Sequence, residues 1–288
     1  MSFARHQTFY LRAGWLAKAV ELLPEKPRLF SLESSTTELG MGKNMVQALR
    51  FWLRATGVVE HKSDKDGGLR LSAFGQLVSE VDPYFEQDLT WWLIHVNIAS
   101  SSNDATAWHF LFNDFNVQEF DSSVFVNGLE ARAKETGEVS RSSLYKDYDC
   151  IRATYIAPRR AGGTPEDNII CPLTKLGLLE ELQSGALRKV QPHRDVPLPV
   201  FYHVALVKAQ GPKRLNVEQL AEGEGSPARL FNLTVDSVYR YLDMLRNHGW
   251  VDYSRTAGLD TVTLLEPSSW RLITAAFRGS IGDDKDAR

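Results

Sequence analysis

The stretch KNMVQALRFWLRATGVVE (residues 43–60) decides the fold that the sequence predicts. Its apolar side chains recur at helical spacing, and Gly57 follows as a residue suited to a left-handed helix end. We therefore expect a helix over residues 43–56. The residues after it predict two short strands, 58–61 and 69–71, around a polar turn.

Two further helices are expected upstream of this stretch. The first covers residues 10–23 and is stopped by Pro24 and Pro27. The second is short, within residues 34–41, and the sequence GMG (residues 40–42) predicts a tight turn after it. Three helices followed by a hairpin is the order of a winged helix-turn-helix, in which the third helix enters the major groove of DNA.

The same pattern recurs near the other end of the chain. LRATGVVE (residues 53–60) and LRNHGWVD (residues 245–252) match in kind at nearly every position. Around the second copy the expected helices cover residues 201–210, 216–222 and 234–248, and the expected hairpin strands cover residues 250–253 and 261–264.

These patterns predict a mainly α fold with short β-hairpins (α+β). Two winged helix-turn-helix modules, residues 1–82 and 201–279, are expected to flank a helical central region, residues 83–200, with a disordered tail at 280–288. Within the central region we expect helices at 89–99, 105–115, 123–137 and 172–183, a loop at 158–165 and a linker at 192–199.

Composition excludes several classes of protein. With 288 residues, 43% of them hydrophobic, and a net charge of −3, the chain predicts a soluble globular protein whose attraction to DNA must come from local basic patches. No secretory signal or membrane span can be identified, so we expect a cytoplasmic protein. Cys150 and Cys171 predict neither a disulfide framework nor a structural zinc; they are interpreted as core residues, with sulfur transfer as the alternative.

A basic stripe is expected on the helix at residues 43–56. Its side chains share the face opposite the apolar one; the arginine and glutamine side chains can reach base edges, and Lys43, near the helix start, suits a phosphate. The alternative is an ordinary solvated helix face. The DNA-binding candidates are Lys43, Asn44, Gln47, Arg50 and Arg54, extended by Lys62, Lys65 and Arg70 on the hairpin.

The second copy carries a weaker signal. Arg240 and Arg255 are candidates for DNA contact, but Asp236 and Asp243 dilute the positive charge. Contact with DNA and contact with protein both stay open for this module.

Candidates for catalysis are sparse, and no standard nuclease signature is present. Acids flank a basic loop that contains Arg159 and Arg160, which could grip phosphate. Exposed loop acids are usually only solvated, but magnesium held by such acids would suit phosphodiester cleavage. The metal candidates are Asp147 and Asp149, and the catalytic candidates are Asp149, Glu166, Asp167 and His6. The turn GMGKN (residues 40–44) is too short for a P-loop, so no nucleotide is expected.

Several longer motifs resemble the SspB-like family, a bacterial domain-of-unknown-function family of the single-strand DNA phosphorothioation system. They are RHQTFYLRAGWL (5–16), ELGMGKNMVQALRFWL (38–53), LSAFGQLV (71–78), DPYFEQDLTWWLIH (82–95), AWHFLFN (107–113) and PEDNIICPLTKLGLL (165–179). Members commonly begin with a Gly-His-Glu version of the first motif. This chain has Arg5-His6-Gln7 there, so a carboxylate function at that position is absent.

The resemblance implies that the protein nicks or presents DNA in an antiviral sulfur-modification system, in which sulfur replaces a non-bridging phosphate oxygen. It also implies a cysteine desulfurase, an ATPase and a sulfurtransferase as partners. A homodimer is an open alternative to a monomer. The competing hypothesis is a non-catalytic DNA-binding adaptor or transcription regulator.

Overall fold

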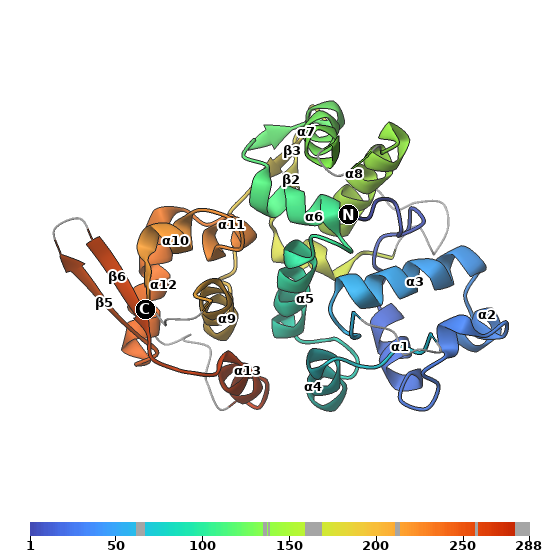
Figure 1. Cartoon of the computed structure of the whole chain (residues 1–288), viewed down its shortest axis with the longest axis horizontal. Helices are drawn as coiled ribbons and strands as arrows, with labels where there is room; N and C mark the ends of the chain where they lie inside the picture. The colour runs from blue at the N-terminus through green and yellow to red at the C-terminus, as the bar shows by residue number, and fades with distance from the viewer. Residues whose placement is uncertain are drawn as a thin grey trace. The chain divides into compact units, whose positions relative to one another are not determined.

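The computed structural model describes residues 1–61, 67–134, 137, 139–158, 169–210, 214–256 and 259–279. Within these ranges the protein is a mixed α/β structure in which helices alternate with two small antiparallel sheets (Figure 1). It divides into two compact units, one formed by Met1–Leu111 with Phe115–Val190 and the other by Phe112–Asp114 with Gln191–Arg288. None of the helices in the described ranges is long and apolar enough to cross a membrane.

The first unit begins with the three predicted helices. They are α1 (Trp15–Leu22), α2 (Ser35–Leu39) and α3 (Lys43–Ala55), with a short 3-10 turn at Leu29–Ser31. Gly40 ends α2 in the left-handed conformation, with φ 62°, as the GMG turn predicted. The Lys18 ammonium donates to the carbonyl of Leu39, so a side chain from α1 fixes the turn that leads into α3.

The end of α3 shows why the sequence needs glycine at two positions. Gly57 has φ 70°, and a Cβ there would lie 2.8 Å from Nδ2 of Asn97. Gly75, within α4 (Ala73–Val81), approaches the chain even more closely, because a Cβ would lie 2.1 Å from the carbonyl oxygen of Val58. The segment that follows α3 therefore packs so closely against α4 that only glycine fits at residue 75.

The first predicted hairpin is only partly present. A single antiparallel bridge joins Val59 to Leu71, and the amide of Glu60 donates to the carbonyl of Arg70. The tip, residues 62–66, lies outside the described residues.

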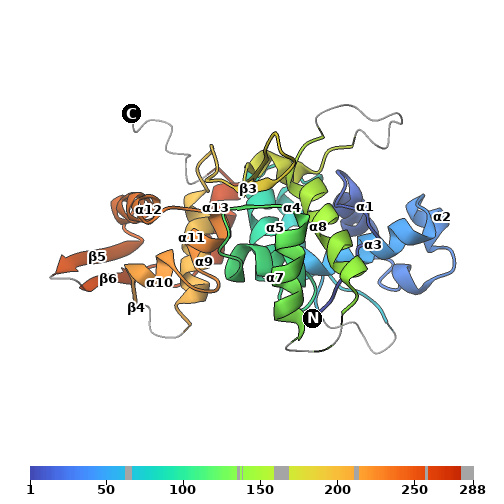
Figure 2. The ribbon, with the colours of Figure 1, turned by 90° about the horizontal axis from the view of Figure 1, so that it is seen from above.

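The central region adds helices and a small sheet to the first unit. The helices are α5 (Asp88–Ser100), α6 (Thr106–His109) with a π-helical turn at Phe110–Asp114, α7 (Ser122–Lys134) and α8 (Arg141–Tyr155). Strands β1 (Glu119–Phe120), β2 (Leu179–Glu181) and β3 (Leu187–Lys189) form an antiparallel sheet in the order β1-β3-β2. Helices α7 and α8 pack side by side (Figure 2).

Two expectations for this region are wrong. Residues 172–183 do not form one helix, because the 3-10 turn at Pro172–Leu176 ends at Gly177, with φ 63°, and strand β2 follows. Residues 141–155 were not expected to be helical, yet they form α8. Asp147 and Asp149 therefore lie on a helix and not in a loop.

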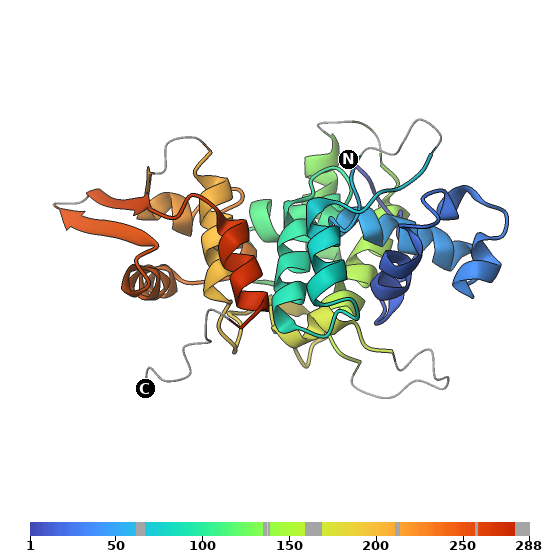
Figure 3. The same cartoon turned by 90° about the horizontal axis from the view of Figure 1, so that it is seen from below.

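Within its described residues the second unit contains the three predicted helices and the two predicted strands, with three further elements that the sequence did not predict. It contains α9 (Leu198–Lys208), β4 (Arg214–Asn216), α10 (Val217–Ala221), α11 (Pro227–Phe231), α12 (Val235–Asn247), β5 (Val251–Thr256), β6 (Leu259–Leu264) and α13 (Ser269–Phe277). The strands form an antiparallel sheet in the order β4-β6-β5. Helices α9 and α13 lie side by side (Figure 3). The predicted tail, residues 280–288, lies outside the described residues.

The sequence repeat is also a repeat of backbone geometry. Gly57 after α3 and Gly249 after α12 both have positive φ, 70° and 71°. The amide of Gly57 donates to the carbonyl of Arg54 at 3.0 Å, and the amide of Gly249 donates to that of Arg246 at 2.9 Å. The two helices thus end in the same way.

Candidate functional site

Helix α3 is fixed by a buried aromatic contact with the N-terminal segment. Trp52 is fully buried, and its indole Nε1 donates to the carbonyl of Phe9 at 3.0 Å. Its ring meets those of Phe51 and Trp108 edge to face, at centroid distances of 5.0 and 5.4 Å. These contacts fix the rotation of α3, and so they determine which side chains face solvent.

The outer face of α3 carries the predicted basic stripe. Lys43, Asn44 and Gln47 are exposed, and Arg50 and Arg54 are half-buried. The helix contains no acidic residue, so its charged side chains are all cations. A helix face of this composition attracts anions.

Arg50 is a partly buried cation of this face. Its Nε is shielded from solvent and has no hydrogen-bond acceptor among the described residues. Burial lowers the pKa of its guanidinium, and repulsion by the neighbouring Arg54 lowers it further. Both effects mean that the charged form of Arg50 is stabilised less here than it would be in water.

The DNA-binding candidate on α12 is electrically different from those on α3. Arg240 donates to both carboxylate oxygens of Asp195, at 2.8 and 3.1 Å, and this bond raises the pKa of the guanidinium. The hydroxyl of Tyr253 is bonded to the carboxylate of Asp243. The charge of Arg240 is therefore already balanced within the protein.

The remaining candidates for DNA contact are placed unevenly. Arg70 is exposed and immediately precedes Leu71, which forms the bridge to Val59. The other basic candidates, Lys62, Lys65, Arg159, Arg160 and the side chain of Arg255, lie outside the described residues.

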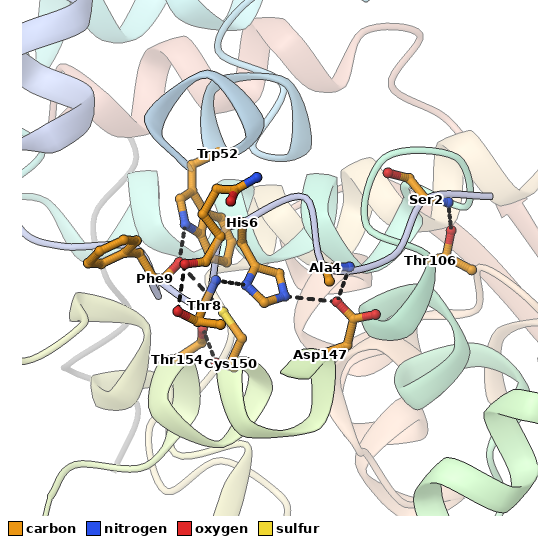
Figure 4. A network of polar contacts seen from close by, with 11 residues as sticks. Ser2, Ala4, His6, Thr8, Phe9, Trp52, Thr106, Asp147, Cys150 and Thr154 are labelled. Atoms are coloured by element: carbon orange, nitrogen blue, oxygen red, sulfur yellow. Dashed lines mark hydrogen bonds and ion pairs between the residues drawn. The ribbon is translucent and has the colours of Figure 1, made fainter. Parts of the chain in front are cut away.

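His6 lies in a buried polar network that ties the N-terminus to α8 (Figure 4). The ring is fully buried, and its Nε2 lies 2.8 Å from Oδ1 of Asp147. The amide of Thr8 donates to Nδ1 at 3.1 Å, so in this arrangement the imidazole proton sits on Nε2 and His6 donates to the carboxylate. The amide of Ala4 donates to the same Oδ1 at 2.9 Å.

This network gives His6 a positioning role. Both of its ring nitrogens are engaged inside the protein, so neither faces a substrate. The backbone around it is strained, because the non-glycine residues Ala4, Gln7 and Thr8 have φ values of 52°, 50° and 66°. The buried bond between His6 and Asp147 holds this segment in place.

Asp147 and Asp149 face opposite ways on α8. Asp147 is 1% exposed, and burial raises the pKa of its carboxyl, although the bond from His6 opposes that shift. Its Oδ2 is buried without a hydrogen-bond partner in the described residues. Asp149 is exposed, so the two carboxylates do not converge on one point.

The described residues offer no set of ligands that fits magnesium. Within them no three His, Cys, Asp or Glu side chains gather closely enough to hold a metal ion. The other predicted acids, Glu166 and Asp167, lie outside the described ranges. We therefore assign no chemical step to a metal at these positions.

Both cysteines are core residues. Cys150 and Cys171 are 2% and 0% exposed, and the Cys150 thiol approaches the carbonyl of Phe9 at 3.6 Å. Burial raises the pKa of Cys150 well above its ordinary value and that of Cys171 to about 12. A thiol that stays protonated is a poor nucleophile, so this environment argues against sulfur transfer through either residue.

The role of Asp147 as a buried partner of His6 was missed from the sequence. A signal was present, because Leu144, Tyr148, Ile151 and Tyr155 follow one another at helical spacing and all are buried. Asp147 falls on the same face of that helix. A carboxylate among such residues needs a donor, and a neutral histidine is a suitable one.

Comparison with known proteins gives a family and two similar structures. The model of the family described as "Protein of unknown function (DUF4007)" matches residues 3–277. Two solved structures, described as SspB and as magnesium ion-bound SspB, are each 25% identical to this chain. The match covers 100% of this chain and 89% of each SspB chain, with a TM-score of 0.83. No curated protein sequence matches the chain.

The buried carboxyl gives the first testable prediction, which concerns pH. The raised pKa of Asp147 means that its stabilising contribution is present below the unfolded pKa and is lost as pH rises through the folded pKa. Asparagine does not ionise. The free energy of unfolding of Asp147→Asn, relative to the natural protein, should therefore rise as the pH increases above about 4, the ordinary pKa of an aspartate.

Urea denaturation at several pH values measures this trend, and Asp121→Asn serves as the control. Bonds from Ser123 and Val124 lower the pKa of Asp121, which is exposed, so the relative stability of that variant should change only below pH about 4 and stay level above it. If both variants followed the same trend, Asp147 would not carry a raised pKa.

Proposed function

Because the chain belongs to the DUF4007 family, we propose that the protein is a DNA-binding component of a DNA phosphorothioate modification system and that it nicks one strand to permit sulfur incorporation. The likeness to SspB over the whole chain supports the choice of system. The single observation that carries the DNA-binding part is the outer face of α3, whose charged residues are all cations.

In this proposal both repeated segments are winged helix-turn-helix modules. For the second unit this is supported by the order of its elements, which is α9, β4, α10, α11, α12, β5, β6. For the first it is supported by helices α1, α2 and α3, followed by the bridge at Val59. In such modules the N-terminal part of the recognition helix contacts base edges. The exposed Asn44 and Gln47 occupy that part of α3.

The two modules have different roles in this proposal. α3 binds DNA because its cations have no acidic residue on their own helix. α12 contacts a partner protein or has only a structural role, because the charge of Arg240 is balanced by Asp195. The cysteine desulfurase, the ATPase and the sulfurtransferase of the system are the proposed partners, and the proposed location is the cytoplasm, where DNA and partners would meet.

A second candidate function is a non-catalytic DNA-binding adaptor. The engagement of both His6 nitrogens favours it, since His6 was the histidine considered for catalysis. Among the acidic candidates Asp149 is exposed and free to meet DNA, whereas Asp147 is buried. The presence or absence of nicking separates the two candidate functions.

Binding to duplex DNA should depend on salt through α3. Each lost phosphate contact lowers the slope of log affinity against log salt by about one, so Lys43→Ala with Arg54→Ala should flatten it by about two. Fluorescence anisotropy with a labelled duplex measures this. Arg240→Ala is the matched control on α12 and should leave the slope unchanged, because Asp195 already balances that charge. Unchanged binding by the folded α3 double variant would exclude this helix from the DNA interface.

A supercoiled plasmid assay tests the nicking part. The purified protein should convert supercoiled plasmid to the nicked form with magnesium and not with a chelator. If Asp149 acts on the transition state, Asp149→Asn should slow nicking by about 100-fold with little change in DNA affinity. The exposed acid of α4 provides the control Glu80→Gln, which should nick normally. DNA binding without nicking would favour the adaptor instead.

A further inference from the structure

Arg50 and Arg54 stand one turn apart on α3, and their positions differ from those of the other candidates on this helix. Both side chains are half-buried, whereas Lys43 and Gln47 are exposed. The charged group that acts on Arg50 is the second cation, Arg54. The helix therefore holds two guanidinium groups close together against its own surface.

This arrangement lacks a counter-charge at Arg50. No carboxylate within the described ranges acts on its guanidinium, and its Nε is shielded without an acceptor. Placing one cation partly out of water costs free energy, and a like charge beside it adds to that cost. An anion bound at Arg50 would offset both effects.

The chain supplies such an anion internally at the equivalent helix. Arg240 on α12 donates to both oxygens of Asp195, in a two-point bond between a guanidinium and a carboxylate. The same fork geometry fits two oxygens of a phosphate group. Arg50 has the same planar guanidinium, but no carboxylate of the described residues takes the place that Asp195 has at Arg240.

We propose that Arg50 and Arg54 together form a binding site for one phosphate group of the DNA backbone. This inference rests on the proposed function, and it assigns a separate task to each half of α3. The half-buried arginines at residues 50 and 54 hold the backbone, while Asn44 and Gln47, exposed near the start of the helix, face the base edges. The sequence alone suggested the opposite for the arginines, since it offered them to base edges.

Inorganic sulfate and phosphate probe the site without DNA. Thermal unfolding is followed at increasing sulfate or phosphate, with ionic strength held constant by sodium chloride. Either anion should raise the melting temperature of the natural protein beyond the chloride control, because a ligand that binds the folded state stabilises it. Arg50→Met should abolish this dependence.

The same variant should have a second signature. Methionine fills the half-buried space of Arg50 without a charge, so in chloride alone Arg50→Met should melt at a temperature equal to or above that of the natural protein. Arg50→Lys keeps the charge and loses the fork, so it should retain a reduced response to sulfate. The exposed cation of α8 provides the matched control, and Lys146→Met should respond to sulfate as the natural protein does.

Measuring the affinity of the same variants for duplex DNA separates this inference from the proposed function. A backbone contact predicts that Arg50→Met weakens binding by about 10- to 100-fold for every duplex sequence tested, with the salt slope reduced by about one. If the natural protein bound DNA but Arg50→Met changed neither DNA affinity nor the sulfate response, the site would be excluded and the proposed function would stand. If the rise in melting temperature with sulfate required Arg50 but the natural protein bound no duplex, the anion site would stand and the proposed function would fail. Loss of affinity for one sequence only would assign Arg50 to base readout and overturn the inference.

Discussion

The packing of Trp52 against the N-terminal segment is the contact on which the proposed role of α3 depends. Its indole donates to the carbonyl of Phe9, and the thiol of Cys150 on α8 approaches the same carbonyl. One backbone oxygen therefore lies between α3 and α8. Because the inner face of α3 is fixed in this way, the outer face with its cations is fixed as well. The bond between His6 and Asp147, a few residues earlier, anchors the strained segment that makes this possible.

The sequence predicted the parts of the fold that depend on local pattern. The turn at residues 40–42, the length of α3, the glycine after it and the predicted helices and hairpin of the second unit follow from periodicity and from the two glycines of the repeat. The sequence did not predict the elements whose formation depends on long-range contacts. Strands β1, β2 and β3 are only two or three residues long, and such short strands leave little pattern in a sequence. Helix α8 was not predicted because polar and charged side chains alternate with its apolar ones.

The candidate site shows the same division between local pattern and tertiary structure. The basic stripe could be predicted, because side chains three and four residues apart share a helix face. The half-burial of Arg50 and the internal partner of Arg240 could not, because Asp195 is 45 residues distant in sequence from Arg240. That ion pair distinguishes two modules that look alike in sequence. The two modules share the backbone geometry at the end of the helix, but the charges on the surfaces of α3 and α12 differ.

The central claim, that α3 and not α12 meets DNA, is tested most directly by crosslinking from single introduced cysteines. Cys150 and Cys171 are buried with raised pKa values, so the natural thiols should react little. Gln47→Cys on α3 and Asp236→Cys on α12 place one exposed thiol on each helix. With a duplex that carries a thiol-reactive group, Gln47→Cys should crosslink efficiently and Asp236→Cys should not. Crosslinking through Asp236→Cys alone, or equally through both, would contradict the account.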